Sequence, residues 1–421
     1  MRKPQLSPNL LEGLFLGMGP KVIGLVVLVG VGCGLVGGFY LFILHVLQSV
    51  LWPTHWSGAI GFAILGGVGL FAALVTRFVG SPGDVELMVD NIHVSGSSTG
   101  VRMLRSLVPI SWLCIASGGA MGPEAPLVQT TGTLASWTAK RARLVVRDSR
   151  VLTIAGMAAG FTVLFGAPLG SAIFALEMLH RRGLQYYEAL LPAVLGSLSG
   201  YGVYVVATGA GLTPIWHLPS PVSLRASDLA WALVAGLGGA LTAIAFTYLS
   251  TLLRTGARKL MPGLRPVVGG LILAALGLAS VYSLTYGESQ INDILAHHGG
   301  TVAFFALAAF AKLLGTSVTL SSEWRGGFII PMFFIGACLG RAMHVLAPGT
   351  NEAVMVAALM AAGNAGVTKT PIGSTLVVSE MAGFRLLPTT LIATVVSFVL
   401  TSQVGLIHTQ RERDVVGEVE T

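Results

Sequence analysis

Apolar segments follow one another along almost the whole of this 421-residue sequence, and several of them are short. A helix that crosses the hydrocarbon core of a bilayer needs about 20 apolar residues. Some segments reach that length and others fall well below it. The segments lie at 22–48, 58–78, 104–120, 124–139, 151–164, 168–180, 187–207, 226–253, 266–284, 301–318, 328–346, 352–363, 369–382 and 387–404. Most of the chain is therefore expected to lie in or against lipid.

Charged residues are scarce throughout. They make up 10% of the chain, whereas a soluble domain carries about 25%. Hydrophobic residues account for 53%. This composition excludes a soluble enzyme, a disordered chain, a disulfide scaffold and a nucleic-acid binder, and it makes the lipid bilayer the expected surroundings.

Glycine and proline clusters stand where many of the apolar segments begin or end. They are Gly80–Asp84, Gly122–Pro126, Gly166–Pro168, Gly326–Pro331 and Lys369–Pro371. Backbone without helical hydrogen bonds is tolerated at membrane depth only where it lines a cavity or is buried in protein. Half-length helices interrupted in this way are typical of transporters, whose substrate sites lie between paired interruptions.

The sequence also repeats itself. Segment 168–178 shares proline, glycine, serine, glutamate and methionine with segment 371–381, 203 residues further on, and Pro126 and Pro331 stand 205 residues apart. We therefore expect an all-α polytopic integral membrane protein with a single membrane domain over 1–421. Its expected parts are a cytoplasmic N-terminus (1–21), a first repeat (22–207), a linker (208–223), a second repeat (224–404) and a short cytoplasmic tail (405–421).

Basic residues gather in five places along the chain, while the segments around 49–57 and 208–223 hold almost none. Loops rich in lysine and arginine stay in the cytoplasm. All five clusters are therefore expected on one side of the membrane, with both termini inside. The clusters are Arg2–Lys21, Lys140–Arg150, Arg181–Arg182, Arg254–Arg265 and Arg411–Arg413.

Glu124 is an acidic residue within an apolar segment, in the sequence Gly-Pro-Glu-Ala-Pro. Proline favours the first turn of a helix, and a helix N-terminus attracts anions through its free N–H groups and partial positive charge. An ionised Glu124 can occupy such an anion site itself, whereas a protonated Glu124 leaves the site open. Ionisable residues within a membrane are functional by default; simple helix capping is the alternative.

Two further glycine-rich turns predict similar helix starts. In Gly326–Pro331 the glycines allow close approach of the backbone, and the N–H groups that follow are free to bind an ion. In Gly80–Asp84, Ser81 is the expected N-cap and a hydroxyl donor. Three such turns in one duplicated membrane domain predict an anion site.

Together these motifs resemble the CLC family of chloride channels and proton-coupled chloride exchangers, in its bacterial form. That family carries G-S-G-I-P, G-K/R-E-G-P and G-x-F-x-P at helix starts that meet at the ion site. Gly80–Ser81, Gly122–Pro126 and Gly327–Pro331 match these motifs. The resemblance covers about residues 20–410. It implies two inverted repeats of about 17 helical segments, with broken, half-length helices meeting at the midplane, and a homodimer in a bacterial plasma (inner) membrane.

The resemblance also implies roles for individual residues. The turn Gly80–Ser81 would contribute the Ser81 hydroxyl to chloride. Gly327 and the backbone N–H groups of Phe328 and Ile329 would complete the chloride site. Glu124 would be the gating glutamate, which alternately binds protons and displaces chloride. No cofactor is implied, and the tail after residue 404 is too short for the paired regulatory nucleotide-binding (CBS) domains of some relatives.

The chain departs from the family pattern around the ion site. Pro123 replaces the usual lysine or arginine, Ala125 replaces glycine, and no tyrosine stands near 406–408, where the family has its ion-site tyrosine. Met178 follows Glu177, where exchangers usually carry a second glutamate that accepts protons on the cytoplasmic side. We expect exchange of chloride or a similar small anion for protons, with a passive glutamate-gated chloride channel as the alternative.

Glu177 has two candidate roles. It can replace the missing proton acceptor, but Glu380 occupies the equivalent place in the second repeat, where no proton path is expected. This symmetry favours a structural role for both glutamates. Beside the third helix start, Glu323 and Arg325 are expected to form a local salt bridge in a loop.

The segment Gly96–Gly100 fits the G-x-S-x-G turn of hydrolases around Ser98. That motif requires a strand, a turn, a helix and a catalytic triad, none of which the pattern indicates. A membrane-embedded hydrolase built on Ser98, or on His297 and His298, is therefore a distant alternative, and we expect no enzyme. The histidines have no third ligand and the three cysteines lie in apolar runs, so no metal site is expected.

Overall fold

The computed structural model describes residues 18–52, 58–181, 184–209, 216, 218, 223–297 and 299–410. Residues 1–17 and 411–421, most of the expected linker, Arg182 and His298 lie outside the described residues. Sixteen α-helices and no strand are found in the described part of the chain. The helices are α2 (Pro20–Leu51), α3 (Gly58–Phe78), α4 (Val85–Ser95), α5 (Leu104–Ala116), α6 (Glu124–Arg141), α7 (Val146–Phe165), α8 (Pro168–Glu177), α9 (Leu190–Thr208), α10 (Ala226–Ala257), α11 (Arg265–Ala279), α12 (Glu288–Ala296), α13 (Val302–Ser321), α14 (Ile329–Leu346), α15 (Glu352–Thr368), α16 (Pro371–Ala382) and α17 (Leu387–Leu400).

The helices differ in length in the way the sequence predicts. Eight segments of the described chain are long and apolar enough to cross a membrane. Other helices are too short: α8 has 10 residues, about 15 Å at 1.5 Å per residue, which is about half of the hydrocarbon core. The prediction of an all-α polytopic protein with half-length helices is confirmed.

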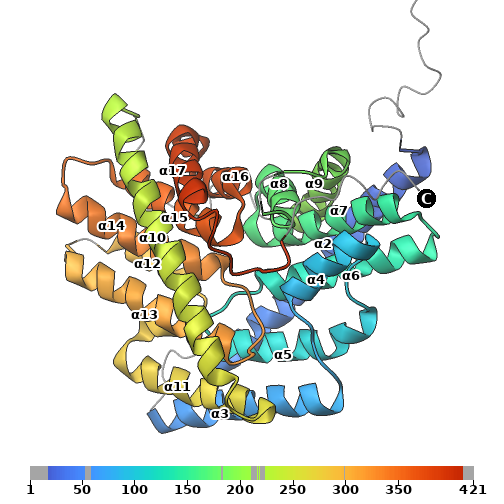
Figure 1. Ribbon diagram of the computed structural model, residues 1–421, viewed down its shortest axis with the longest axis horizontal. Coiled ribbons are helices and arrows are strands. Elements are labelled where there is room, and N and C mark those ends of the chain that lie inside the picture. The colour runs from blue at the N-terminus through green and yellow to red at the C-terminus, as the bar shows by residue number, and fades with distance from the viewer. Residues whose placement is uncertain are drawn as a thin grey trace, which may run out of the picture.

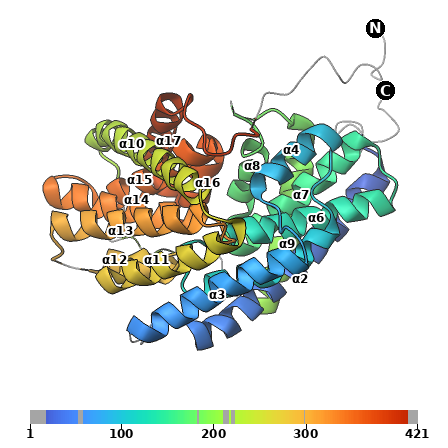
Figure 2. The ribbon, with the colours of Figure 1, turned by 60° about the horizontal axis from the view of Figure 1, so that its bottom comes forward.

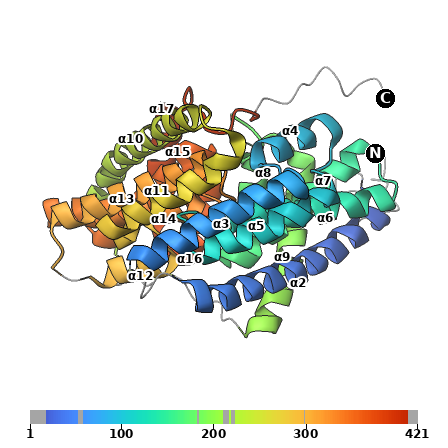
Figure 3. The ribbon, with the colours of Figure 1, turned by 90° about the horizontal axis from the view of Figure 1, so that it is seen from below.

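The two halves of the chain contain the same helices in the same order. α2 and α10 each have 32 residues, and each later helix up to α9 has a counterpart in α11 to α17. Figure 2 shows the halves as two groups, one coloured blue to green and the other yellow to red. Equivalent helices pack against each other where the groups meet, α8 on α16 (Figure 1) and α3 on α11 (Figure 3).

Glycines allow α8 and α16 to cross closely. A Cβ atom on Gly170 would lie 2.5 Å from the backbone nitrogen of Val377, and one on Gly373 would lie 2.6 Å from the Cα of Phe174. Real Cβ atoms do not approach other atoms this closely, so only glycine fits at either position without a shift of the helices. The repeated proline–x–glycine sequence at the start of each helix therefore encodes this contact.

Basic loops that are distant in the sequence lie near one another. Lys21 donates a hydrogen bond to the carbonyl of Ala142 at 3.2 Å. α4 connects two other clusters, because Arg150 binds the carbonyl of Ile92 near its C-terminal end at 3.1 Å and Arg254 pairs with Glu86 in its first turn. We call this side of the molecule the basic face. At 1.5 Å per residue, α2 extends about 48 Å from Pro20, so its C-terminal end marks the opposite face.

Candidate functional site

The turns that precede α6 and α14 lie side by side inside the molecule. Gly122 donates its N–H to the carbonyl of Gly327 at 2.8 Å, and Gly327 donates to the carbonyl of Gly122 at 2.6 Å. This antiparallel bridge joins equivalent positions of the two repeats. A Cβ atom on either glycine would collide with the side chain of Glu124. The expected meeting of two broken helices is therefore confirmed, and a side chain at either glycine would displace the Glu124 carboxylate from its observed position.

Glu124 is the first residue of α6 and is completely buried. Its Oε1 accepts a hydrogen bond from the backbone N–H of Ile330 at 2.5 Å, and its Oε2 is buried without a hydrogen-bond partner. Ile330 lies in the first turn of α14, where N–H groups lack intrahelical acceptors and carry partial positive charge. The carboxylate therefore occupies the position at this helix N-terminus that an anion would take.

A small cavity of about 30 Å³ lies beside this contact. Its lining includes Gly327, Phe328 and Ile329, the residues predicted from the sequence. Thr368, which the sequence did not indicate, provides the one polar side chain among the lining residues. Because one water molecule needs about 10–15 Å³ of such space, the cavity suits one or two particles of the size of water or a monatomic ion. The Ile330 N–H was also missed, since Ile330 looks like any apolar residue of the helix.

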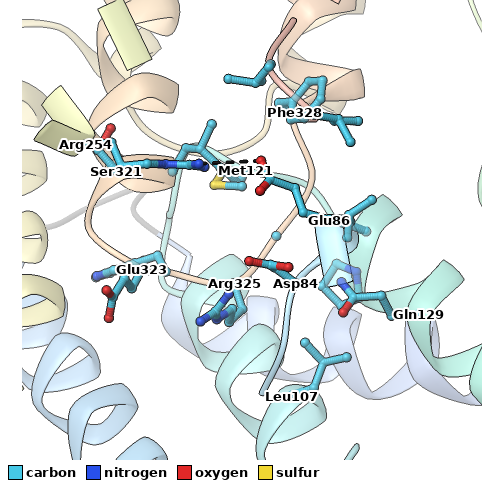
Figure 4. A pocket seen from close by; sticks show the side chains of 18 of the residues that line it. Asp84, Glu86, Leu107, Met121, Gln129, Arg254, Ser321, Glu323, Arg325 and Phe328 are labelled. Carbon is cyan, nitrogen blue, oxygen red and sulfur yellow. Dashed lines mark ion pairs between the residues drawn. The ribbon is translucent and has the colours of Figure 1, made fainter. Parts of the chain in front are cut away.

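A larger cavity of about 280 Å³ adjoins the small one, because Val85, Ala125, Phe328 and Ile407 line both. We call this larger cavity the vestibule (Figure 4). It lies at the basic face, where four arginines and three acidic residues line it. A surplus of positive charge attracts anions towards a buried site. The charged lining residues are Arg254, Arg258, Arg265, Arg325, Asp84, Glu86 and Glu323.

Ion pairs connect the walls of the vestibule. Arg254 and Glu86 are 3.6 Å apart, and their contact is the dashed line in Figure 4. Arg265 binds Glu323 at 2.6 Å. The expected local pair of Glu323 with Arg325 is wrong, because Glu323 has a left-handed backbone with φ of 64° and its carboxylate binds Arg265, the first residue of α11, instead.

The turn at Gly80–Asp84 does not form the helix start that the sequence predicts. α4 begins at Val85, and its N-cap is Asp84, whose side chain accepts an N–H of the first turn at 2.8 Å. Ser81 is exposed, and neither Gly80 nor Ser81 is among the lining residues of the two cavities. The prediction of Ser81 as N-cap is wrong because a Pro-Gly pair separates it from the helix. Asp84 places a carboxylate beside Arg325 (Figure 4).

Glu177 and Glu380 make reciprocal contacts where α8 and α16 cross. The carboxylate of Glu177 accepts two backbone N–H groups from the first turn of α16, at 2.7 and 3.3 Å. The carboxylate of Glu380 accepts two from the first turn of α8, at 2.8 and 3.3 Å. Each glutamate therefore caps the equivalent helix of the other repeat, which favours the structural role. Met178 lines the small cavity with an apolar side chain.

The segment where a tyrosine was expected is apolar. Leu406 and Ile407 are buried, both line the vestibule, and Ile407 also lines the small cavity. Neither side chain offers a hydroxyl group. Thr368 is therefore the one side chain with a hydroxyl group at the small cavity, beside the backbone N–H groups at the start of α14.

The hydrolase alternative finds no geometric support in the described residues. The Ser98 hydroxyl lies 3.1 Å from that of Thr133, and no strand precedes the turn. The ring of His297 stacks on Phe304 with centroids 4.6 Å apart. No group of three or more His, Cys, Asp or Glu residues suited to a metal ion is found in the part of the chain that the structure describes.

The chain is similar to known proteins over most of its length. A model of the voltage gated chloride channel family matches residues 68–402. The chloride/fluoride channel protein of Pseudomonas syringae pv. tomato is 28% identical over 399 residues, which covers 88% of this chain and 82% of the relative. The voltage-gated ClC-type chloride channel ClcB of Citrobacter koseri is 32% identical over 314 residues, or 72% of this chain and 73% of the relative.

Solved structures show the same architecture. A CLC-type fluoride/proton antiporter has a TM-score of 0.82 at 24% identity, covering 93% of this chain and 98% of that chain. A slow cyanobacterial Cl⁻/H⁺ antiporter has a TM-score of 0.78 at 20% identity, covering 92% and 97%. The expected inverted-repeat fold with broken helices is confirmed.

Proposed function

Since this chain belongs to the voltage gated chloride channel family and transports small anions across a membrane, we propose that it exchanges them for protons, with Glu124 as both gate and proton carrier. The observation that carries the proposal is the contact between Glu124 Oε1 and the Ile330 N–H. An ionised carboxylate and an anion compete for the same helix N-terminus. Protonation removes the charge of Glu124 and weakens its hold on that position.

This competition couples the two ions. When Glu124 is protonated and leaves the start of α14, an anion from the vestibule takes its place. When Glu124 loses the proton, its carboxylate returns and displaces the anion. One site therefore alternates between a proton-bearing side chain and an anion. The unsatisfied Oε2 supports this account, because a carboxylate held by only one hydrogen bond is released at lower cost than a fully bonded one.

A passive glutamate-gated channel is the second candidate. Met178 favours it, because an apolar side chain lines the cavity where exchangers usually have a proton acceptor. The two similar solved structures are those of a fluoride/proton antiporter and a Cl⁻/H⁺ antiporter, which favours exchange. We therefore place exchange first.

We propose chloride or fluoride as the transported anion. The relative from Pseudomonas syringae is named for both ions, and the small cavity of about 30 Å³ suits a dehydrated monatomic anion. We further propose that the basic face and both termini lie in the cytoplasm, by the positive-inside rule. A homodimer in the bacterial plasma membrane completes the proposal, by analogy with the family.

Flux from liposomes tests the exchange directly. Purified protein is reconstituted in vesicles loaded with chloride or fluoride and diluted into a low-anion buffer, with an anion electrode and a pH electrode in the same chamber. We expect anion efflux to drive protons into the vesicles against a pH gradient. Anion efflux without proton movement would make the protein a channel, and the absence of both fluxes would contradict anion transport by this chain.

A further inference from the structure

Arg325 stands two residues before Gly327, and so far it counts only as one of the four arginines of the vestibule. The pattern of the sequence paired it with Glu323, but that carboxylate binds Arg265. Arg325 lines the vestibule, whereas Gly327 lines the small cavity. Because two residues of extended chain span at most about 7 Å, Arg325 lies where the vestibule approaches the small cavity.

Contacts on both sides hold the backbone of Arg325 in place. Trp324 is buried, and its indole N–H donates a hydrogen bond to the carbonyl of Pro266 at 2.8 Å. On the other side, Gly327 exchanges two backbone hydrogen bonds with Gly122. The position of Arg325 is therefore fixed by its neighbours in the chain, and its side chain is not needed to hold the turn.

The other arginines of the vestibule are paired or exposed. Arg254 and Arg265 each pair with a glutamate, and Arg258 is exposed. Arg325 is half-buried, and none of the ion pairs found among the described residues includes it. Its Nε atom is buried and has no hydrogen-bond partner in the described structure. Arg325 therefore combines partial burial with a guanidinium group that no carboxylate binds.

Asp84 lies beside Arg325 in Figure 4, but its carboxylate is used elsewhere. Asp84 is the N-cap of α4, and its Oδ1 accepts the N–H of Leu87 at 2.8 Å. The N–H groups of Arg325 therefore remain available to a mobile anion. The negative charge of Asp84 also weakens the hold of Arg325 on such an anion, and a transported ion must be able to leave its site.

The chemistry of the guanidinium group indicates what binds there. It is planar, permanently charged and has only N–H donors, so its natural partner is an anion. A polar N–H that is buried without an acceptor is costly, and an ion is one of the partners that can satisfy it. A chloride or fluoride ion in the vestibule can accept hydrogen bonds from Arg325.

The turn that carries Arg325 also touches the gate. A Cβ atom on Gly327 would lie 2.5 Å from Oε2 of Glu124, the oxygen that has no hydrogen-bond partner. The short segment from Arg325 to Gly327 therefore has the vestibule at one end and the unpaired oxygen of Glu124 at the other. An anion held by Arg325 is close to the place that Glu124 leaves when it is protonated.

We propose that Arg325 binds the transported anion in the vestibule before that anion replaces Glu124 at the start of α14. While the ionised Glu124 occupies the helix N-terminus, the anion stays with Arg325. When Glu124 is protonated and moves away, the anion passes to the backbone N–H groups of α14. This inference rests on the proposed function, because its ligand is the chloride or fluoride ion that the protein is proposed to carry.

A purely structural role for Arg325 predicts different behaviour. A cation that only stabilises the fold through the nearby carboxylate of Asp84 lowers stability when it is removed. Flux would then fall by the same factor at every anion concentration. Loss of an anion-binding residue raises the anion concentration that gives half of the maximal flux, while the maximal flux persists.

The test measures flux from liposomes at a series of chloride or fluoride concentrations for Arg325→Gln. We expect the half-saturating anion concentration to rise about tenfold, within the range of electrostatic focusing in a cleft, with the proton-to-anion ratio of the wild type. Arg325→Lys keeps the charge without the planar fork and should restore part of the affinity. Thermal unfolding in detergent checks the stability of each variant.

Arg258→Gln is the matched comparison, because it removes the same charge from an exposed arginine of the same cavity. Solvent screens an exposed charge, so we expect the half-saturating concentration to rise only about twofold. A rise of equal size in both variants would assign the effect to the net charge of the vestibule and overturn the Arg325 site.

The remaining outcomes separate this site from the proposed function. A wild-type half-saturating concentration in Arg325→Gln would overturn the site and leave the proposed exchange intact. Lower stability with a uniform loss of flux that Arg325→Lys does not repair would assign Arg325 a structural role. A wild-type protein that moves anions but no protons would overturn the exchange alone, and one that moves neither chloride nor fluoride would overturn both.

Discussion

The centre of the molecule and the crossing of α8 with α16 contain the same kind of contact, a carboxylate bound to a helix N-terminus, with different roles. In both regions a glutamate from one repeat places its carboxylate on a helix N-terminus of the other. At the crossing, Glu177 and Glu380 each accept two N–H groups, in a reciprocal pair. At the centre, Glu124 accepts one N–H and leaves Oε2 unpaired.

The difference shows how a carboxylate on a helix N-terminus can be either a structural contact or a gate. A carboxylate whose oxygens are both bonded is costly to remove, because two backbone N–H groups lose their partners. A carboxylate with one unpaired oxygen costs less free energy to displace, and a cavity beside it has room for the anion. Glu124 differs from Glu177 in the number of hydrogen bonds that its carboxylate accepts and in the cavity beside it, since the residue type is the same.

Glu177→Ala is expected to have the largest effect on stability. It removes two hydrogen bonds from the start of α16 and leaves the buried N–H of Gly373 without its partner, at a cost of about 3 kcal/mol. Unfolding of the detergent-solubilised protein by denaturant measures the cost, and Glu380→Ala is the matched variant, with a similar loss expected. Normal stability together with lost proton coupling would instead make Glu177 a proton carrier and break the comparison.

Gly373→Ala tests how closely α8 and α16 pack at the same crossing. The new Cβ would approach the Cα of Phe174 at 2.6 Å, and such overpacking typically costs about 2 kcal/mol. Gly67→Ala is the control, because nothing lies within 4 Å of a Cβ there, and it should be neutral or slightly stabilising. Equal midpoints of unfolding for both variants would show that the helices do not cross as closely as described.

Ser81→Ala is expected to have the smallest effect on stability and on anion selectivity. It tests whether Ser81 belongs to the anion site. Ser81 is exposed and lies outside the lining of both cavities. Stability should change by less than about 0.5 kcal/mol, with anion selectivity unchanged in a reversal-potential measurement. A shift in selectivity would return Ser81 to the anion site.

Much of the fold follows from the sequence, because duplication and helix-breaking residues are visible in it. The Pro-x-Gly pairs of α8 and α16 and the glycines before α6 and α14 predict where helices start and meet. Contacts that change when a turn has one residue more or less cannot be predicted from the sequence pattern. Asp84 caps α4 in place of Ser81, and Glu323 turns away from Arg325, because turn geometry rather than residue type decides both contacts.

The side-chain composition of the centre was also only partly predictable. Glu124 stands out as a charge in an apolar segment, so its importance is visible in the sequence. Ile407 and Thr368 are ordinary residues for a membrane helix or loop, and only the folded arrangement brings them to the cavity.

The most direct test of the account compares Glu124→Gln with Glu177→Gln in the liposome assay. The account predicts that Glu124→Gln passes anions but moves no protons against a gradient, because an amide cannot carry the proton. Glu177→Gln, which keeps an oxygen acceptor at the crossing, should still couple anion efflux to uphill proton uptake. Uphill proton uptake by Glu124→Gln at the wild-type rate would contradict the central claim that this half-bonded carboxylate is where anion and proton compete.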